Sequence, residues 1–340
     1  MKTVVALGAA AIDMLFRVDR LPGPDEMVFA EDGPYLLPGG STANIAVGLA
    51  RLGLTSRFVG KVGRDDNGRR LLEAFEREGV DSSFVLVDDQ GRTAETIIAV
   101  DRKGTRVIFS LGGTAILEAP GEFREEALEG AAALYVGEAM PSVGVRVMRA
   151  AKDRGALIVY GPGGALSGLG TDALADMIRL ADYLVLSRGE VSLLTGKADL
   201  DAAMTALTDA GATRVVVTQG DRGADLFELN VDGGTPAGTV ERWHRDALKV
   251  PVVDTTGAGD AFTSGFIRGV VAGLERDQCL ALGNACGALA VSKMGAREAL
   301  PVWEEVRALI APPGRPSGTS SKSSTRSWRD TEDGSAPASE

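Results

Sequence analysis

Histidine and cysteine are the scarcest reactive residues of this sequence, with one histidine, His244, and two cysteines, Cys279 and Cys286. A histidine-based catalytic triad or a multi-histidine metal site is therefore excluded, unless the chemistry runs through His244 alone. If the chain is an enzyme, its catalytic base is expected to be a carboxylate. The two cysteines have a spacing that places them on one face of a helix, which predicts small buried core residues rather than a zinc site. So few cysteines fit a reducing compartment, and we expect a cytoplasmic protein.

Positive charge and long apolar runs are also lacking. The chain has 36 basic and 47 acidic residues, a net charge of −11. This balance excludes a protein that wraps nucleic acid, although a local basic pocket for a small phosphate is still allowed. No apolar run reaches the roughly 18 residues that a membrane span needs, so no membrane partner is expected. Segment 1–11 has features of a short signal peptide, but it runs into Asp13 as a first buried strand would, and we prefer the strand.

The sequence does have enough apolar residues, 44% of 340, for a large core. Apolar runs of strand length alternate with segments of helical period. This alternation predicts an α/β fold with a mostly parallel sheet covered by helices on both faces. The predicted strands are 4–7, 58–59, 132–136, 157–160, 183–186 and 215–218. The predicted helices are 42–52, 69–78, 143–152, 172–180 and 199–210.

Two regions break this alternation. Residues 15–37 contain short extended pieces interrupted by Pro22 and Pro24, and residues 93–100 and 106–111 have the pattern of a hairpin. We expect these antiparallel pieces, within about 14–37 and 92–111, to form a small separate sheet that makes a cleft or a lid. The segment 311–340 is half proline, glycine and serine, so it is expected to be a disordered tail after a domain that covers 1–310.

The most informative segment is 254–262, with the sequence DTTGAGDAF. Phe262, Phe266 and Val270 continue it with helical spacing, so the glycine-rich turn is predicted at a helix start. The free N–H groups of such a turn form an anion site, which the helix dipole strengthens. A carboxylate beside a bound phosphate is repelled unless it has a chemical role, which points to Asp260 as a general base. The alternative is an ordinary glycine-rich turn in which Asp260 only starts the helix.

Two further glycine-rich turns follow predicted strands or open helices. Residues 38–44, PGGSTAN, open a helix in which Asn44 can both donate to and accept from a diol. Residues 218–223, TQGDRG, follow a strand, at the sheet edge where open α/β folds bind ligands. The alternatives are a capped helix start and a plain β-turn. The chain has no P-loop and no complete dinucleotide-binding fingerprint, so a P-loop ATPase is excluded and a dinucleotide oxidoreductase is disfavoured.

Together these segments resemble the ribokinase-like (PfkB-type) carbohydrate kinases. Residues 39–53 are similar to the first signature of that family, and residues 254–262 to its second, more specific signature. Residues 218–223 and 60–68, GKVGRDDNG, also match in order. The resemblance covers about residues 3–310. It implies a three-layer αβα sandwich with a small β lid, ATP and Mg²⁺ as cosubstrate and metal, and a small sugar as the acceptor.

The resemblance also implies roles for individual residues. Asp260 would be the base that takes the proton of a sugar hydroxyl, and the backbone N–H groups of Gly257, Ala258 and Gly259 would stabilise the transferred phosphoryl. The residues implied to bind the sugar are Asp13, Gly39, Gly40, Asn44 and Glu138. The residues implied on the nucleotide side are Ser187, Glu190, Thr218, Gly220, Gly223 and Asn284. Glu190 would hold Mg²⁺ through a water, and Asp254 with Thr256 falls where relatives hold a monovalent cation such as potassium.

One position departs from the family pattern, because relatives usually have asparagine where this chain has Ser187, three residues before Glu190. A hydroxyl can hold a magnesium-bound water but cannot reproduce the amide, so the property that this departure affects is the affinity for magnesium or the activation of the enzyme by phosphate. Ser187 and Glu190 precede a further family run, LLTG, at 193–196.

Several functions on this scaffold stay open at this point. A nucleoside kinase needs an aromatic or apolar base pocket, and aromatic residues make up only 5% of the chain. A sugar-phosphate kinase needs a basic cluster at the sugar end, which Arg17, Arg92, Lys103 and Arg106 could supply. A sugar-binding regulator that has lost catalysis is a further alternative, and the complete 257–260 loop argues against it. A homodimer through the lid strands, whose edges are otherwise exposed, is a further expectation.

Overall fold

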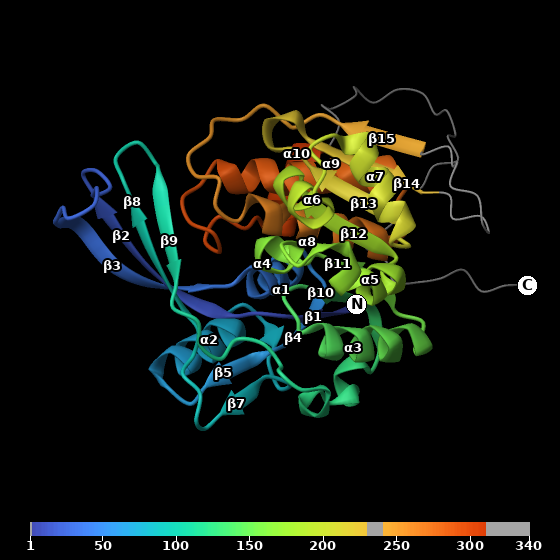
Figure 1. Cartoon of the computed structure of the whole chain (residues 1–340), viewed down its shortest axis with the longest axis horizontal. Helices are drawn as coiled ribbons and strands as arrows, with labels where there is room; N and C mark the ends of the chain where they lie inside the picture. The colour runs from blue at the N-terminus through green and yellow to red at the C-terminus, as the bar shows by residue number, and fades with distance from the viewer. Residues whose placement is uncertain (1, 230–240, 311–340) are drawn as a thin grey trace, which may run out of the picture.

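The structure is a computed structural model that describes residues 2–229 and 241–310 (Figure 1). Its central sheet has nine strands in the order β15-β14-β13-β12-β11-β10-β1-β4-β6. The strands are β1 (Thr3–Leu7), β4 (Thr55–Val59), β6 (Val80–Asp81), β10 (Ala131–Val136), β11 (Leu157–Tyr160), β12 (Tyr183–Ser187), β13 (Arg214–Thr218), β14 (Ala224–Glu228) and β15 (Glu241–Arg245). The expected tail, 311–340, lies outside the described residues.

The central sheet is parallel from β6 to β13, and only β14 and β15 run antiparallel to their neighbours. Parallel strands bring their carboxyl ends to one edge, which is where ligands bind in open α/β sheets. The predicted turn after β13 and the position of Glu138 after β10 therefore fall on the same edge of the sheet.

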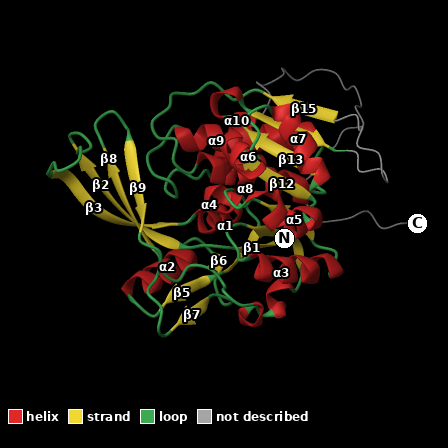
Figure 2. Cartoon of the chain, in the orientation of Figure 1, coloured by secondary structure: helices red, strands yellow, loops and turns green. Residues whose placement is uncertain are grey.

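Helices cover both faces of the central sheet, as the strand–helix alternation predicts (Figure 2). Side chains alternate along β1, so Val4 and Ala6 enter one core while Val5 and Leu7 enter the other. Helices α1, α2, α8, α9 and α10 pack in the first core, and α3, α5, α6 and α7 pack in the second. The helices are α1 (Ser41–Arg51), α2 (Asp66–Arg77), α3 (Pro141–Asp153), α4 (Gly163–Ser167), α5 (Gly170–Leu180), α6 (Arg188–Thr195), α7 (Leu200–Asp209), α8 (Ala258–Ala272), α9 (Arg276–Val291) and α10 (Trp303–Ile310).

The predicted elements agree with the structure to within a few residues at their ends. All six predicted strands lie within or coincide with strands of the central sheet, and all five predicted helices are present. Cys279 and Cys286 are buried on α9, as their spacing predicts. Within the described part of the chain, no helix has both the length and the apolarity that a bilayer crossing requires.

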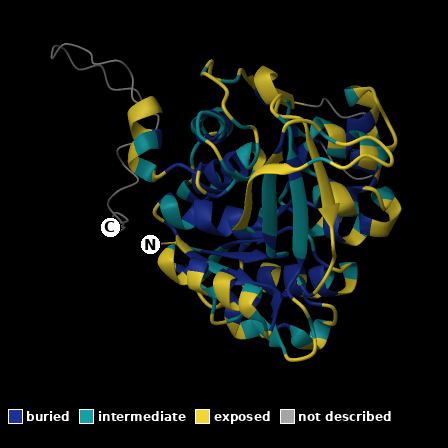
Figure 3. Cartoon of the chain, turned by 90° about the vertical axis from the view of Figure 1, so that its left-hand side faces the viewer, coloured by how far each residue is buried: buried dark blue, intermediate teal, exposed yellow. Residues whose placement is uncertain are grey.

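A second sheet of four strands, the small sheet, stands apart from the layered body in Figure 1 and faces the viewer in Figure 3. Its order is β3-β2-β8-β9, and its strands are β2 (Ala11–Val18), β3 (Ala30–Gly39), β8 (Glu95–Val100) and β9 (Arg106–Ser110). The β8–β9 hairpin is confirmed. Two expectations are wrong: segment 15–37 is not made only of short pieces, since β3 is a ten-residue strand, and β2 pairs with β8 in parallel.

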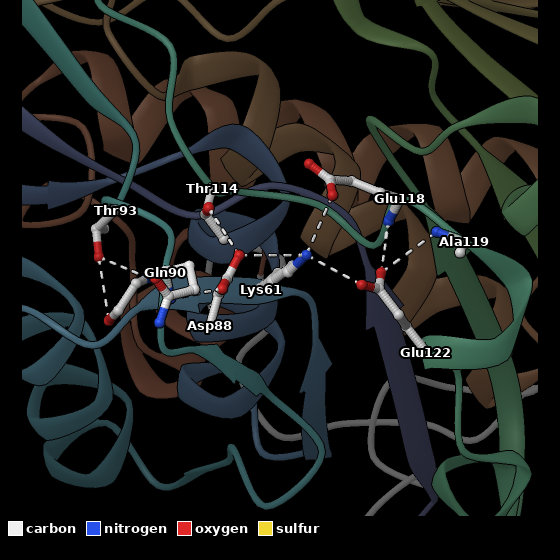
Figure 4. A network of polar contacts seen from close by, with 9 residues as sticks. Lys61, Asp88, Gln90, Thr93, Thr114, Glu118, Ala119 and Glu122 are labelled. Carbon is white, nitrogen blue, oxygen red and sulfur yellow. Dashed lines mark hydrogen bonds and ion pairs between the residues drawn. The ribbon is translucent and has the colours of Figure 1, made fainter.

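A buried lysine ties the base of the small sheet to the body (Figure 4). Lys61 opens β5 (Lys61–Gly63), which pairs with β7 (Leu86–Asp88), and its side chain is 6% exposed. Its ammonium group lies 3.0 Å from Glu122, 3.2 Å from Glu118 and 3.5 Å from Asp88. Asp88 in turn accepts from the hydroxyl of Thr114, the residue at which the chain returns from β9. Burial disfavours the Lys61 charge, but the hydrogen bonds to Glu122 and Glu118 outweigh this effect and raise its pKa.

We expect Lys61→Met to lower the free energy of unfolding by about 2–3 kcal/mol, because it leaves three carboxylates without their shared cation. These carboxylates keep some contact with water, so the loss stays below that of a fully buried pair. Urea denaturation measures the change. Lys152→Met removes a half-exposed lysine 3.8 Å from Asp182 and is the control, with an expected loss below about 0.5 kcal/mol. Equal losses in the two variants would contradict this account of the network.

Candidate active site

The amino end of α8 presents unbonded N–H groups beside a carboxylate. Gly257 is the N-cap, and its φ of 77° is unfavourable for any residue with a side chain. A Cβ at this position would also lie 2.6 Å from the carbonyl oxygen of Ala296. Among the described residues, the N–H groups of Gly257 and Gly259 have no hydrogen-bond partner, whereas that of Ala258 makes a 3.3 Å bond to Thr255. The predicted helix start is therefore confirmed, and N–H groups that are free at the start of a helix can bind an anion.

Asp260, the third residue of α8, is held by two donors from α1. Its Oδ1 accepts from the hydroxyl of Ser41 at 2.7 Å, and its Oδ2 accepts from Nδ2 of Asn44 at 2.9 Å. Burial raises the pKa of Asp260, these two hydrogen bonds lower it, and the nearby charges of Glu138 and Glu190 raise it again, to about 7. A carboxyl group with a pKa near neutrality is suited to exchange a proton at physiological pH.

Two more carboxylates that the sequence predicts near the ligand also lie at this edge of the sheet. Glu138 follows β10 and accepts from the hydroxyl of Thr42 at 2.9 Å. Asp13 on β2 accepts from the hydroxyl of Thr96 and touches Gly39, where no side chain would fit. Burial raises the pKa of both carboxyl groups. Such perturbed groups cluster at functional sites more often than elsewhere.

Two cavities meet beside Asp260. A small one of about 140 Å³ is lined by Asp260, Ser41, Ser187 and Glu190 among others. A larger one of about 530 Å³ has a mainly apolar wall. Its lining includes three residues of the predicted nucleotide turn, Thr218, Gly220 and Gly223, together with Leu248, Val250, Phe262 and Asn284. Thr218 and Gly259 line both cavities. A ligand with a flat apolar end and an anionic end would therefore reach the free N–H groups of α8.

The match to known proteins agrees with this geometry. Residues 1–303 match the family described as pfkB family carbohydrate kinase. This chain belongs to that family. It is therefore a phosphotransferase that acts on an alcohol group of a carbohydrate, and the resemblance seen in the motifs is confirmed.

The relatives of this kinase include enzymes for free and for phosphorylated sugars. Fructokinase-1 of Zea mays is 31% identical over 86% of this chain and 94% of its own length. The ATP-dependent ribose-1-phosphate kinase of Halopiger xanaduensis is 30% identical over 92% of this chain and 99% of its own. The Arabidopsis thaliana ribokinase solved with ribose and ATP has a TM-score of 0.77 and 26% identity, covering 92% of this chain and 99% of that one. The fold of this kinase is thus the ribokinase fold, a three-layer αβα sandwich.

Ser187 of this kinase is the N-cap of α6. Its hydroxyl accepts from the N–H of Glu190 at 3.2 Å, and the Glu190 carboxylate accepts from the N–H of Ser187 at 2.7 Å. This reciprocal pair is a capping box, which fixes the Glu190 side chain at the wall of the small cavity. The serine therefore keeps the local structure that positions Glu190.

Asp254 and Thr256, the pair expected near a monovalent cation, are tied into the backbone. Asp254 accepts from the N–H and hydroxyl of Thr256 and, at 3.0 Å, from the N–H of Gly295. Arg106 of the small sheet donates to the Thr256 hydroxyl. A positive charge is therefore already present beside this pair. No group of three or more metal-ligating side chains occurs within 2–229 and 241–310.

Two residues that contact the site were missed from the sequence. Ser41 lies inside a glycine-rich segment that we singled out, but its contact with Asp260 depends on how α1 meets α8. Arg297 lies beyond the last motif and donates to Asn44 and Gly39. No local pattern marks a single arginine as part of a site, so only the tertiary structure reveals it.

Proposed function

We propose that this kinase transfers the γ-phosphoryl group of ATP to a hydroxymethyl group of a small sugar that is ribose-, fructose- or ketodeoxygluconate-like. The observation that carries the proposal is the position of Asp260, a carboxyl group of near-neutral pKa beside the free N–H groups of α8, where the two cavities meet. The larger cavity suits a nucleotide base, and the residues at the other end of the site suit sugar hydroxyls.

In the proposed reaction, Asp260 accepts the proton of the sugar hydroxyl while the oxygen attacks the γ-phosphorus. The bond from that phosphorus to the β-bridging oxygen breaks, and ADP leaves with the electron pair. Negative charge on the transferred group is stabilised by the N–H groups at Gly257–Gly259 and by the dipole of α8. Asp13, Gly39, Gly40, Asn44 and Glu138 form the proposed sugar side, where Asp13 and Glu138 can accept from hydroxyls.

The proposed nucleotide and metal contacts follow from the same two cavities. Thr218, Gly220, Gly223 and Asn284 line the larger cavity, in which the nucleotide base would be bound. Mg²⁺ neutralises phosphate charge and is bound mainly by phosphate oxygens, so it needs few protein ligands. Glu190, which the Ser187 cap holds at the small cavity, would reach it through a water. We propose separately that a potassium ion binds beside Asp254 and Thr256. Equal rates of turnover in potassium and tetramethylammonium salts would contradict this potassium site.

A sugar phosphate is the second candidate acceptor, because two arginines of the small sheet face the body without an acidic partner in the described residues. Arg106 contacts Thr256, and Nη2 of Arg17 lies 3.7 Å from the sulfur of Met294. Arg92, by contrast, pairs with Glu95. Neither arginine makes an ion pair within the described residues, although the charge of Arg106 also lowers the pKa of Asp254, and a guanidinium group suits a phosphate on the acceptor.

A panel of acceptors tests the proposal and separates the two candidates. ADP release from ATP and Mg²⁺ is measured with ribose, fructose, 2-keto-3-deoxygluconate, ribose 1-phosphate, fructose 6-phosphate, adenosine, cytidine and pseudouridine. The expected result is a strong preference for a free sugar. A preference for a sugar phosphate that Arg17→Ala and Arg106→Ala abolish would favour the second candidate. A preference for a nucleoside, or no turnover with ATP binding retained, would overturn both.

We further propose that the small sheet is the lid of the site and pairs two copies of the chain. Within the described residues, neither edge strand, β3 or β9, has a partner on its outer side, and β9 exposes Ile108 and Phe109. The expected mass in solution is therefore that of a dimer, and Phe109→Lys is expected to give a monomer. Leu193→Lys, which changes an equally exposed apolar residue on α6, is the control. Analytical ultracentrifugation measures both, and a monomeric wild type would refute the pairing.

A further inference from the structure

One buried arginine contacts the proposed site from outside all of its motifs. The Arg297 side chain lies between α1 and the end of β3, and the residue is 4% exposed. Its Nε donates to Oδ1 of Asn44 and its Nη2 donates to the carbonyl oxygen of Gly39, each at 3.2 Å. Its own carbonyl oxygen accepts from Arg51 of α1 at 3.0 Å. Burying an arginine costs free energy unless its charge is compensated by contacts, so a role of Arg297 must depend on the contacts that it makes.

The contact with Asn44 determines which way the asparagine amide faces. The oxygen and nitrogen of a side-chain amide are similar in size, so an asparagine can turn by half a rotation unless its partners differ. An arginine only donates, so it requires the amide oxygen on its side. The Nδ2 group must then face Asp260, to which it donates at 2.9 Å. The donor that reaches Asp260 is therefore set by a residue that does not touch Asp260.

We infer that Arg297 is a positioning residue for the base of this kinase, because it fixes the Asn44 amide so that an N–H group always faces Asp260. The inference rests on the proposed role of Asp260. An amide turned the other way would place its oxygen against the carboxylate, and Asp260 would then hold its proton instead of accepting one. Arg297 also holds Gly39, which touches Asp13, so one guanidinium group connects the proposed base to the proposed sugar contacts.

Asp260 and Arg297 have different charged neighbours, so a pH experiment must distinguish an effect on Asp260 from an effect on the groups around Arg297. The charged groups around Asp260 are Glu138 after β10 and Glu190 on α6, with Asn44 and Ser41 as neutral donors. The charged groups around Arg297 are Asp13 on β2, Glu78 after α2, Arg51 on α1 and the adjacent Glu298. Burial lowers the pKa of Arg297 to about 10, so it stays protonated at neutral pH. Loss of Arg297 is therefore expected to act on Asp260 through Asn44 and on Asp13 directly.

The test is the pH dependence of kcat in single and double variants. In Arg297→Met the acid limb of the profile is expected to move up by about one pH unit, since Asp260 loses its fixed donor. In an Asn44→Ala background, Arg297→Met is expected to cause no further shift of the acid limb, because the amide through which Arg297 acts on Asp260 is absent. Arg297→Gln is the second variant, since its amide can present either atom to Asn44, and it is expected to shift the limb in the same direction.

Arg268→Met is the matched control. Arg268 is also buried, lies over the ring of Trp303 and has no contact with the site, so its loss should lower stability and leave the acid limb in place. An unmoved acid limb in folded Arg297→Met or Arg297→Gln would overturn the inference, as would an undiminished shift in the Asn44→Ala background. Near-normal turnover of Asp260→Asn would instead show that Asp260 is not the base. Failure of the proposed function and failure of the inference about Arg297 are therefore distinguishable.

Discussion

Asp260→Asn is expected to lower kcat at least about a hundredfold while ATP and the acceptor still bind, because a positioned general base contributes that much or more. The variant should fold, since the new amide can accept from Asn44 and donate to the Ser41 hydroxyl, which can turn to accept. ADP release measures turnover, and calorimetry measures the binding of ATP. Asp201→Asn, a surface aspartate on α7, is the control. Turnover within about tenfold of the wild type would contradict a role as base.

The same carboxyl group predicts the pH dependence of the wild type. Asp260 can accept a proton only when it is ionised, and burial raises its pKa to about 7. The rate is therefore expected to fall about tenfold for each pH unit below that value and to level off above it. In Asp260→Asn this acid limb is expected to disappear from the residual activity.

Gly257→Ala is expected to lower kcat by about 10²–10³-fold, the effect of losing one preorganised backbone donor. A Cβ at Gly257 would lie 2.6 Å from the Ala296 carbonyl oxygen, and a φ of 77° disfavours any side chain. The first turn of α8 must then shift, and its N–H groups no longer converge on one point. Steady-state kinetics at saturating ATP and acceptor measure the loss.

Gly155→Ala separates the loss of the anion site from simple backbone strain. Gly155 has a similar φ of 72°, and a Cβ there would meet no atom within 4 Å. It is expected to cost about 1 kcal/mol of stability and to leave kcat unchanged. If the two variants lose stability equally and both keep their turnover, the N–H groups at Gly257–Gly259 do not stabilise the transferred group.

The parts of the site that could be predicted from sequence are those with a local signature. Asp260 and its glycines follow one another in a single turn, and the helix after them has a clear period, so the geometry at the start of α8 was expected. The strand–helix alternation likewise predicted the central sheet, because each unit buries its own apolar face.

Long-range contacts have no such signature. The parallel pairing of β2 with β8 joins residues more than 80 positions apart, and the alternation within each strand does not specify its neighbour. The bond from Arg297 to Asn44 spans 253 positions. The proposed contact of Asn44 with sugar hydroxyls stays a prediction, and the structure adds that each polar atom of its amide also bonds a protein group. The sequence marked Asn44 as part of the site, and only the fold shows what it contacts.

The small sheet joins the body along a narrow base, where Thr93 pairs with Thr114 and the Lys61 network lies alongside. The α8 turn and both cavities belong almost wholly to the layered body. Under the proposed function, the acceptor contacts are therefore divided: Asp13 and Gly39 belong to the small sheet, whereas Asn44 and Glu138 belong to the body with the α8 turn. Mutations in β8 and β9, which are not linked to Asp260 through Arg297 as Gly39 of β3 is, can change the preferred acceptor without altering the chemistry, which gives a lineage of such enzymes a route to new substrates.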